Sequence, residues 1–306
     1  MTRRAPGPRR LVLRAAALAS LGLGATGCTL DEWTRFGFPV PITEQGDRIL
    51  GLWQGATIAA IAVGLFTLAL ILGAAFAFRK KSDALPSQVH YNLPIELLYT
   101  AVPFVIVSVL FYFTAVDEAQ VNRLSEDPDV TVGVVGFQWN WRFDYADHNL
   151  AVLGRPGELP QLVLPTNRTI QFVETSPDVI HSWWVPEFIF KRDVIPGRKN
   201  KFEVTLKEGT EGVYTGRCAE YCGLYHQRMY FTVQVVSPQE YDRFIASASA
   251  AAAAGDDPNF ATVGAANKMF ESGTGAAAVA RAASTTPPVA AVGAGTAASS
   301  PSGSTK

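Results

Sequence analysis

Metal-binding side chains are concentrated in one short segment of this chain. Residues 218–229 read CAEYCGLYHQRM, which supplies the thiols of Cys218 and Cys222, the imidazole of His226 and the thioether of Met229. A second imidazole, His181, lies upstream between two strand-like stretches. Thiolate, thioether and imidazole ligands together favour copper. One copper ion needs fewer ligands than these five side chains provide, whereas two copper ions bridged by two thiolates would use them all.

Two other interpretations of the cysteines remain open at this point. The chain has three cysteines, and a disulfide between Cys218 and Cys222 would suit an exported protein. Zinc is the other alternative, but zinc seldom binds methionine, and C-x3-C followed by H-x2-M is an unusual zinc spacing. Alone, His181 would be read as a buried core residue and Met229 as a core-filling side chain. Their spacing relative to the cysteines favours the copper site.

The ligand segment resembles the copper A site of cytochrome c oxidase subunit II. The resemblance rests on C-x-E-x-C-G-x-x-H-x-x-M in residues 218–229 and on DVIHSW in residues 178–183. It extends through KRDVIPGR in residues 191–198 and QWNW in residues 138–141, and covers roughly residues 45–240. It implies a cupredoxin-like domain that binds two copper ions.

The resemblance also implies a role for each ligand. Cys218 and Cys222 would bridge both copper ions. His181 and Met229 would complete one copper, and His226 with the backbone carbonyl of Glu220 the other. The carboxylate of Glu220 would help to hold a magnesium or manganese ion at the boundary with subunit I, since a carboxylate and waters suit such a hard cation.

Trp139 is implied to be the exposed ring through which electrons arrive from a c-type cytochrome, although a lone tryptophan here would more often be a core residue. Acidic residues usually surround this point in the family and steer a basic donor. The candidates for that role are Glu174, Asp178 and Glu187. Four basic residues fall in the same half of the domain: Lys191, Arg192, Lys199 and Lys201. A membrane-bound c-type cytochrome is therefore a reasonable alternative to a strongly basic soluble donor.

The N-terminus reads as an export signal followed by a lipidation site. Residues 1–27 carry five arginines, no acidic residue and an apolar stretch too short to span a bilayer. Small residues directly before Cys28 predict a lipoprotein signal, with a plain signal peptide and an incidental cysteine as the alternative. Without this segment the formal net charge of −1 becomes −6. An acidic chain argues against nucleic acid as a partner.

Two apolar segments predict a transmembrane hairpin. Residues 49–78 contain no charged residue and residues 93–116 only Glu96, and both exceed the roughly 20 residues that span a bilayer. The loop between them, residues 79–92, begins with three basic residues and is therefore expected in the cytoplasm. Residues 28–48 and the chain after the second helix would then be extracytoplasmic, in a multi-pass protein of the plasma membrane.

Glu96 would be costly if it faced lipid. Alone, it reads as an interfacial carboxylate at the end of a helix. Its neighbours Pro94, Thr100 and Pro103 match the second helix of subunit II. The corresponding glutamate lies there at the mouth of a proton-uptake path into subunit I, so the resemblance implies this role for Glu96.

Alternation of apolar and polar residues predicts an all-β domain after the hairpin. The alternating stretches are residues 130–134, 169–172, 201–206 and 231–235. This period of two, with Gly and Pro between the stretches, predicts a cupredoxin-like Greek-key β-sandwich over residues 120–245. Residues 246–306 are rich in Ala, Gly, Ser, Thr and Pro, and we expect a disordered tail with a short helix around residues 260–270 as its one exception.

The resemblance as a whole implies the electron-accepting subunit of a haem-copper oxidase, which reduces oxygen to water and pumps protons. Its partners would be oxidase subunits I and III, a c-type cytochrome and membrane lipid, and electrons would pass to a haem in subunit I. A Sco-type copper chaperone also has C-x3-C, but it has one anchor and a thioredoxin-like pattern. Nitrous oxide reductase needs more than the four histidines of this chain. A quinol-oxidising subunit II lacks the copper ligands.

Overall fold

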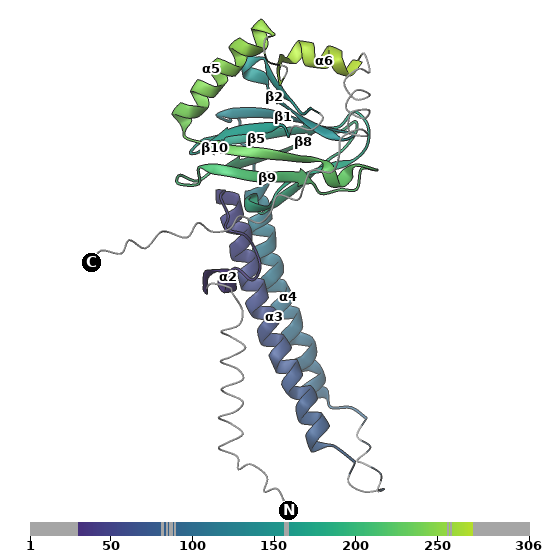
Figure 1. Ribbon diagram of the computed structural model, residues 1–306. Helices are drawn as coiled ribbons and strands as arrows, with labels where there is room; N and C mark the ends of the chain where they lie inside the picture. The colour runs from purple at the N-terminus through teal and green to yellow at the C-terminus, as the bar shows by residue number, and fades with distance from the viewer. Residues whose placement is uncertain are drawn as a thin grey trace, which may run out of the picture.

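The computed structural model describes residues 30–271, apart from residues 81, 82, 84, 86, 87, 89, 156–158, 256 and 258. The predicted signal segment, the expected lipidation site Cys28 and the last part of the expected tail lie outside the described residues. The described chain is a helical hairpin joined to a β domain (Figure 1).

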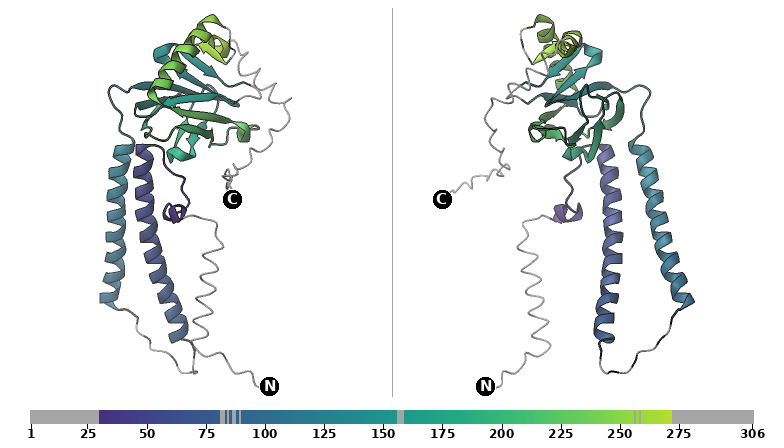
Figure 2. Two further views of the ribbon diagram at one scale, coloured as in Figure 1. Left: turned by 60° about the vertical axis from the view of Figure 1, so that its left-hand side comes forward. Right: turned by 90° about the vertical axis from the view of Figure 1, so that its right-hand side faces the viewer.

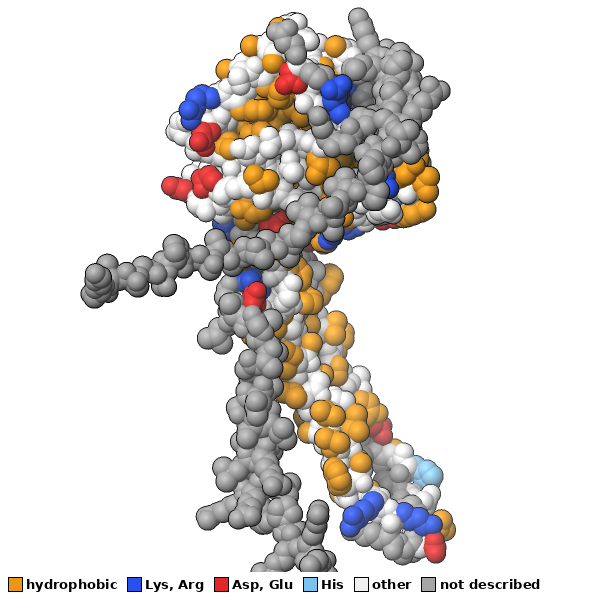
Figure 3. Space-filling view, in the orientation of Figure 1, with side chains coloured by type: hydrophobic (Ala, Val, Ile, Leu, Met, Phe, Trp, Pro, Cys, Tyr) orange, Lys and Arg blue, Asp and Glu red, His pale blue; other side chains and the backbone are white. Residues whose placement is uncertain are grey.

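Two long helices form the hairpin. α3 covers Glu44–Ala77 and α4 covers Leu93–Val121, and both are long and apolar enough to cross a membrane. A short helix, α2, covers Leu30–Thr34 and precedes them. α3 and α4 run side by side below the domain in both views of Figure 2. Figure 3 shows apolar side chains along the hairpin and basic side chains at its far end, which agrees with a loop on the side of the membrane opposite the domain.

Both helices extend beyond the apolar segments that the sequence predicted. α3 begins before residue 49, after Thr43, whose hydroxyl accepts a hydrogen bond from the Gly46 N–H at 2.9 Å. α4 continues past residue 116. The apolar pattern marks the part of each helix that can lie in lipid. The N-cap Thr43 and contacts with the domain set where α3 begins. Lys207 of the domain binds Asp47 in the first turn of α3 at 2.9 Å, so the extended end also attaches the helix to the domain.

Two sheets pack face to face in the domain, as the sequence predicted for a sandwich. The six-stranded sheet has the order β11 (Phe260–Thr262), β3 (Leu150–Leu153), β2 (Asn140–Tyr145), β1 (Val130–Phe137), β5 (Thr169–Thr175) and β8 (Asn200–Thr205). The five-stranded sheet has the order β4 (Gln161–Pro165), β10 (Tyr230–Val236), β9 (Gly212–Cys218), β6 (His181–Val185) and β7 (Phe190–Val194). β1 pairs in parallel with β5, and β10 with β4. This topology is not the βαβ pattern of a thioredoxin-like chaperone.

Aromatic rings fill the space between the sheets. Phe172 and Phe202 stack with ring centroids 4.8 Å apart, and Trp183 lies 5.6 Å from Phe231. All four are fully buried. Phe172, Phe202 and Phe231 lie in three of the alternating stretches that predicted strands, whereas Trp183 lies in β6, which has no such alternation. The same buried cluster includes both cysteines and the methionine of the ligand segment, so the candidate site is built directly on the core.

The domain does not end at residue 245, where we expected a disordered tail to begin. α5 covers Pro238–Ala254, β11 extends the six-stranded sheet by pairing with β3, and α6 covers Val263–Glu271. We interpreted the alanine-rich sequence as low complexity, but alanine is also the strongest helix former. The short helix expected around residues 260–270 is present in part, after β11.

A capping box fixes the start of α5. The Ser237 hydroxyl accepts a hydrogen bond from the Glu240 N–H, and the Glu240 carboxylate accepts one from the Ser237 N–H. Tyr241 and Ile245 then bury one face of the helix against the sandwich. The pattern S-x-x-E followed by apolar residues was the signal in the sequence for this helix.

Candidate metal centre

The candidate ligands gather at one end of the sandwich. Cys218 is the last residue of β9, and His181 is the first residue of β6. Met229 directly precedes β10, and Cys222 and His226 lie in the loop between β9 and β10. Because β9 and β10 pair antiparallel, the loop returns to its starting point and brings its two ends together.

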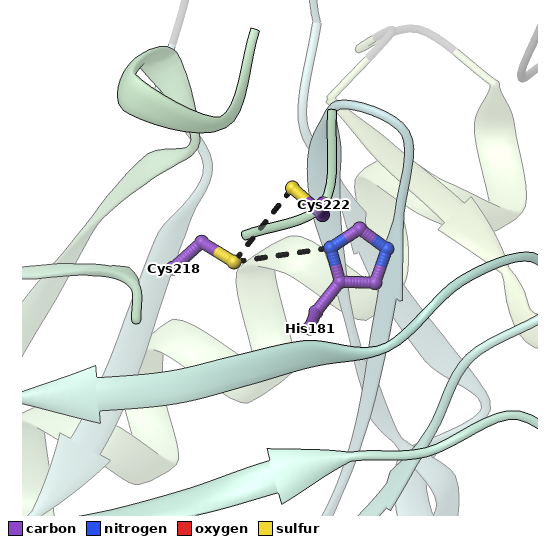
Figure 4. A group of neighbouring side chains, drawn as sticks. All are labelled: His181, Cys218 and Cys222. Atoms are coloured by element: carbon purple, nitrogen blue, oxygen red, sulfur yellow. Dashed lines mark hydrogen bonds between the residues drawn. The ribbon is translucent and has the colours of Figure 1, made fainter. Parts of the chain in front are cut away.

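The donor atoms of the five side chains face one another. The Sγ atom of Cys218 lies 3.9 Å from Sγ of Cys222 and 3.9 Å from Nδ1 of His181. The Sγ atom of Cys222 lies 3.6 Å from Nδ1 of His226 and 3.4 Å from Sδ of Met229. Figure 4 shows Cys218, Cys222 and His181 converging from separate segments. The two thiols are free, with their sulfur atoms well beyond the roughly 2.0 Å of a disulfide bond.

Glu220 contributes its backbone to the same place. Its carbonyl oxygen accepts a hydrogen bond from the Cys218 thiol at 3.2 Å. Its side chain is exposed. The backbone therefore faces the candidate centre while the carboxylate faces outward, so one residue can contact two different sites.

Asp178 orients His181, a role that our reading of the sequence missed. Oδ1 of Asp178 lies 3.0 Å from Nε2 of His181, which leaves Nδ1 directed at Cys218. Oδ2 of Asp178 accepts a hydrogen bond from the Gln138 N–H at 2.7 Å. A histidine that binds a metal usually donates its other ring N–H to a carboxylate, which fixes its tautomer and orientation. The spacing D-x-x-H was the available signal.

Hydrogen bonds favour the ionised form of the exposed Asp178 beside the buried His181. Burial alone would raise the pKa of Asp178, but hydrogen bonds from His181 and from the N–H groups of Gln138 and Val179 outweigh it and lower the pKa. Burial alone would lower the pKa of His181, but its contacts with Asp178 and Cys218 raise it. The carboxylate therefore stays ionised beneath the imidazole.

The two thiols influence each other in opposite directions. The hydrogen bond with Cys222 lowers the pKa of Cys218, and the same contact raises the pKa of Cys222. A bound cation would displace the remaining proton, because thiolates rather than thiols bind metals. The site offers two thiolates, two imidazoles, a thioether and a carbonyl. This set fits soft copper ions better than zinc, because zinc seldom binds methionine.

Trp139 lies against the ligand loop. Its Nε1–H donates to the carbonyl of Cys222 at 3.2 Å, and Nε2 of Gln138 donates to the same carbonyl at 2.8 Å. Gly223 has a φ of +119°, and a Cβ there would lie 3.2 Å from the indole, so the close approach requires glycine. Trp139 is half-buried and packs on the edge of the core rather than standing free on the surface.

Trp141 is a core residue beneath the ligands. It is fully buried, and its Nε1–H donates to the carbonyl of Met229 at 3.3 Å. Its ring lies edge-on to the His181 imidazole, with centroids 6.1 Å apart. The two tryptophans of the QWNW run thus support the loop from two sides.

Two of the three acidic residues that we expected around Trp139 lie elsewhere. Glu174 is fully buried on β5, because it shares the inner face of that strand with Ile170 and Phe172. Glu187 lies in η2 (Pro186–Phe188), where its carbonyl accepts a hydrogen bond from the Ile42 N–H close to α3. Asp178 is the only one of the three beside the site, and it is engaged by His181.

One of the expected basic residues is held at the base of the domain, and another pairs with an acidic neighbour. Arg192 donates to the Asn122 side chain at 2.6 Å, just after α4, and Lys191 pairs with Asp193 at 3.5 Å. Arg228, a basic residue that we did not consider, lies in the ligand loop itself, over the ring of Tyr225.

Glu96 occupies the first turn of α4, at the opposite end of the hairpin from the metal centre. Its carboxylate accepts a hydrogen bond from the Asn92 N–H at 2.9 Å, and the Asn92 side chain accepts one from Ile95 at 3.4 Å. Glu96 and Asn92 thus cap the start of α4. A role in proton uptake stays a prediction.

A membrane hairpin that carries a cupredoxin-like sandwich, with soft ligands in the loops at one end, defines the class of membrane-anchored copper proteins. Residues 158–236 match the family model for the periplasmic domain of cytochrome c oxidase subunit II. A probable cytochrome c oxidase subunit 2 from Streptomyces avermitilis is 44% identical over 277 aligned residues, which cover 78% of this chain and 86% of the relative. The cytochrome c oxidase subunit 2 of Mycobacterium tuberculosis is 36% identical, over 79% of this chain and 82% of the relative.

Among solved structures, the periplasmic domain of subunit II of the cytochrome oxidase of Bradyrhizobium japonicum is 30% identical. It covers 40% of this chain and 96% of its own, with a TM-score of 0.36. The extent and identity of the Streptomyces match show that this chain belongs to the cytochrome c oxidase subunit II family. It is thus a membrane-bound component of an oxidase complex, with an extracytoplasmic domain.

Proposed function

We propose that this chain accepts electrons from a c-type cytochrome and passes them to a haem in subunit I of the oxidase. The observation that carries the proposal is the convergence of five soft side chains and one carbonyl on a single point at the end of the sandwich. Two copper ions held there would supply reversible one-electron transfer.

We assign the ligands as the family resemblance implies. Cys218 and Cys222 would bridge both copper ions, and the near contact of their sulfur atoms supports this assignment. His181 and Met229 would complete one copper. His226 and the Glu220 carbonyl would complete the other.

The chain also keeps these ligands from moving. Cys218 and His181 lie on paired strands, with Cys218 opposite Trp183 across β6 and β9. Asp178 fixes the imidazole of His181, and Trp141 holds the backbone of Met229. Electron transfer benefits from a site that rearranges little, and ligands locked by packing and hydrogen bonds provide one.

Trp139 is the proposed contact with the donor. Its hydrogen bond to the Cys222 carbonyl joins the indole directly to the backbone of a ligand. The exposed part of the ring would meet the donor, and the buried part would rest on the loop.

The remaining assignments follow from the place of the subunit in the oxidase. We place the protein in the plasma membrane, in contact with subunits I and III. Oxygen would be reduced in subunit I, coupled to proton pumping. The outward-facing carboxylate of Glu220 would bind magnesium or manganese at the boundary with subunit I. Glu96 would lie at the mouth of the proton-uptake path, and Cys28 would carry lipid at the mature N-terminus. Mass spectrometry of the intact mature chain tests the last assignment.

The decisive test of the copper site is electron spin resonance of the purified oxidase, since metal analysis of the whole complex also counts copper bound by other subunits. We expect two copper ions in this subunit and a spectrum in which the unpaired electron couples equally to two copper nuclei. A single copper, or coupling to one nucleus alone, would contradict the proposal.

A further inference from the structure

Three side chains contact one another in series on the rim of the metal centre: Trp139, Tyr225 and Arg228. The ring of Tyr225 meets the indole of Trp139 edge-on, with centroids 5.0 Å apart and an angle of 89° between the planes. The guanidinium of Arg228 lies over the Tyr225 ring, 5.3 Å from its centroid. Neither Tyr225 nor Arg228 has a role among the ligands.

The turn around His226 builds this series of contacts. Tyr225 is the N-cap of the short 3₁₀ helix η3 (His226–Arg228), and the Arg228 N–H donates to the Tyr225 carbonyl at 2.8 Å. Side chains three residues apart lie above one another in a 3₁₀ turn. The turn that supplies His226 to the metal centre therefore also places Arg228 on Tyr225, and Tyr225 against Trp139.

Tyr225 supplies a restraint on Trp139 that the hydrogen bond alone cannot give. The bond from Nε1 to the Cys222 carbonyl holds one edge of the indole, and the ring could still tilt about that edge. Gly223, beside the ring, has no side chain that would oppose such a tilt. An edge-to-face contact at 5.0 Å is the favoured geometry for an aromatic pair, and it opposes the tilt directly.

We propose that Tyr225 is a positioning residue for electron arrival: it holds the Trp139 indole against the Cys222 carbonyl in the orientation that the donor meets. The proposal rests on the function proposed for Trp139 and adds the residue that sets its geometry. Phenylalanine should replace Tyr225 well, because the contact uses the ring. Alanine or leucine should not.

The test uses the purified oxidase and four single variants: Tyr225→Ala, Tyr225→Leu, Tyr225→Phe and Trp139→Ala. Stopped-flow absorption follows the reduction of the copper centre by a soluble c-type cytochrome. A small inorganic reductant, which needs no docking surface, serves as the second electron source. Gln227→Ala, an exposed change on the same 3₁₀ helix, is the matched control.

We expect Tyr225→Ala and Tyr225→Leu to slow reduction by the cytochrome about 2- to 10-fold. This is the rate ratio that corresponds to the interaction energy of one aromatic pair. Tyr225→Phe and Gln227→Ala should stay close to the wild-type rate. Reduction by the small reductant, the copper content and the copper spectrum should be unchanged in the three Tyr225 variants and in Gln227→Ala. Cryo-electron microscopy of Tyr225→Ala should show the indole displaced from the Cys222 carbonyl.

A double-mutant cycle separates positioning from a direct contact with the donor. If Tyr225 acts through Trp139, adding Tyr225→Ala to Trp139→Ala causes no further slowing. Fully additive slowing would overturn the proposal, because Tyr225 would then act independently of Trp139.

The outcomes also separate this inference from the function on which it rests. A normal rate in Trp139→Ala would remove the role of Trp139 and the positioning role with it. A slow Trp139→Ala beside a normal Tyr225→Ala would overturn the role of Tyr225 alone. Loss of copper in both Tyr225→Ala and Tyr225→Leu would show that the ring is structural, which also overturns positioning.

Discussion

The carboxylate of Asp178 and the imidazole of His181 lie 3.0 Å apart, so the residue that orients a candidate copper ligand stands three positions before it in the chain. The same carboxylate accepts a hydrogen bond from the backbone of Gln138, which precedes Trp139. One side chain therefore ties the β6 ligand to the aromatic run after β1. The metal centre and the proposed point of electron arrival share this support.

Replacing Asp178 with alanine should weaken copper binding without removing a ligand. We expect the copper affinity to fall about 10- to 100-fold, as is usual when the hydrogen-bond partner of a metal-binding histidine is lost. Retention of copper by the purified oxidase against increasing chelator measures this. Asp178→Asn should be milder, since its amide oxygen can still accept from the ring N–H of His181. Wild-type retention in Asp178→Ala would show that packing alone orients His181.

The cysteines and the methionine should differ sharply in what their loss does. Cys218→Ser or Cys222→Ser should abolish the coupled two-copper spectrum, because either change removes a proposed bridge. Met229→Leu should keep the copper and shift its redox potential, because a thioether is a weak ligand that tunes the potential. Redox titration followed by electron spin resonance distinguishes these results. A Met229→Leu protein without copper, or a native spectrum in Cys222→Ser, would reverse the assigned roles.

The ligand set is the part of this molecule that could be predicted most completely from the sequence. Soft donors at close spacing favour copper, and the structure brings all six predicted ligand groups together. The supporting residues were harder to predict. Asp178 was expected to face the donor, and its contact with His181 was not predicted because a loop conformation brings the two together. The contact between Tyr225 and Trp139 joins two segments whose proximity no local pattern encodes.

Glu174 shows a different limit. The period of two in β5 places position 174 on the same inner face as Ile170 and Phe172, so its burial could have been predicted. Its charge led us instead to expect a surface residue. In the alanine-rich region after residue 245, composition outweighed the capping box and the buried face of α5.

Glu174 should make the domain less stable as the pH rises. Burial raises its pKa well above 4.5, and this outweighs the opposing effect of nearby Arg192. The folded state therefore keeps a proton that the unfolded state releases, and stability falls as the pH rises above about 4.5 towards the folded pKa. Glu174→Gln should match the wild type near pH 4.5 and be more stable at pH 8.

Glu174→Leu provides the comparison, because it also removes the buried oxygen atoms that lack hydrogen-bond partners within the described residues. It should be more stable at both pH values, by about 1–3 kcal/mol. Thermal unfolding of the variants, followed by the absorption of the copper centre, measures both effects. An equal stability difference between wild type and Glu174→Gln at the two pH values would rule out the buried-proton explanation.

Ending the chain after residue 245 should destabilise the domain, whereas ending it after residue 271 should not. The shorter chain loses the second half of α5, β11 and α6. It also loses the contact between the rings of Phe260 and Phe244, whose centroids lie 6.2 Å apart, and the 2.8 Å hydrogen bond from Arg142 to Asn267. We expect the melting temperature to fall by about 5–15 °C, which corresponds to a few kcal/mol in a domain of this size. Equal melting temperatures for the two chains would mean that these elements pack without contributing stability.

Arg228 should influence which donor the oxidase accepts. Its exposed side chain places a positive charge over Tyr225, which contacts Trp139. Of the three acidic residues expected there, only Asp178 lies beside the site, and its carboxylate is engaged by His181. Charges on the rim of an interface act mainly on the association rate and its salt dependence. With a basic soluble cytochrome c as donor, Arg228→Glu should therefore raise the second-order rate of copper reduction at low ionic strength, by about 2- to 10-fold.

Arg243→Glu is the matched control, because it makes the same change in net charge on α5, which packs on β3, β4 and β11. Stopped-flow rates over a range of ionic strength should show a larger increase for Arg228→Glu, converging with the wild type at high salt as the charges are screened. An equal increase in both variants would mean that only the net charge matters and that Arg228 has no special place in donor recognition.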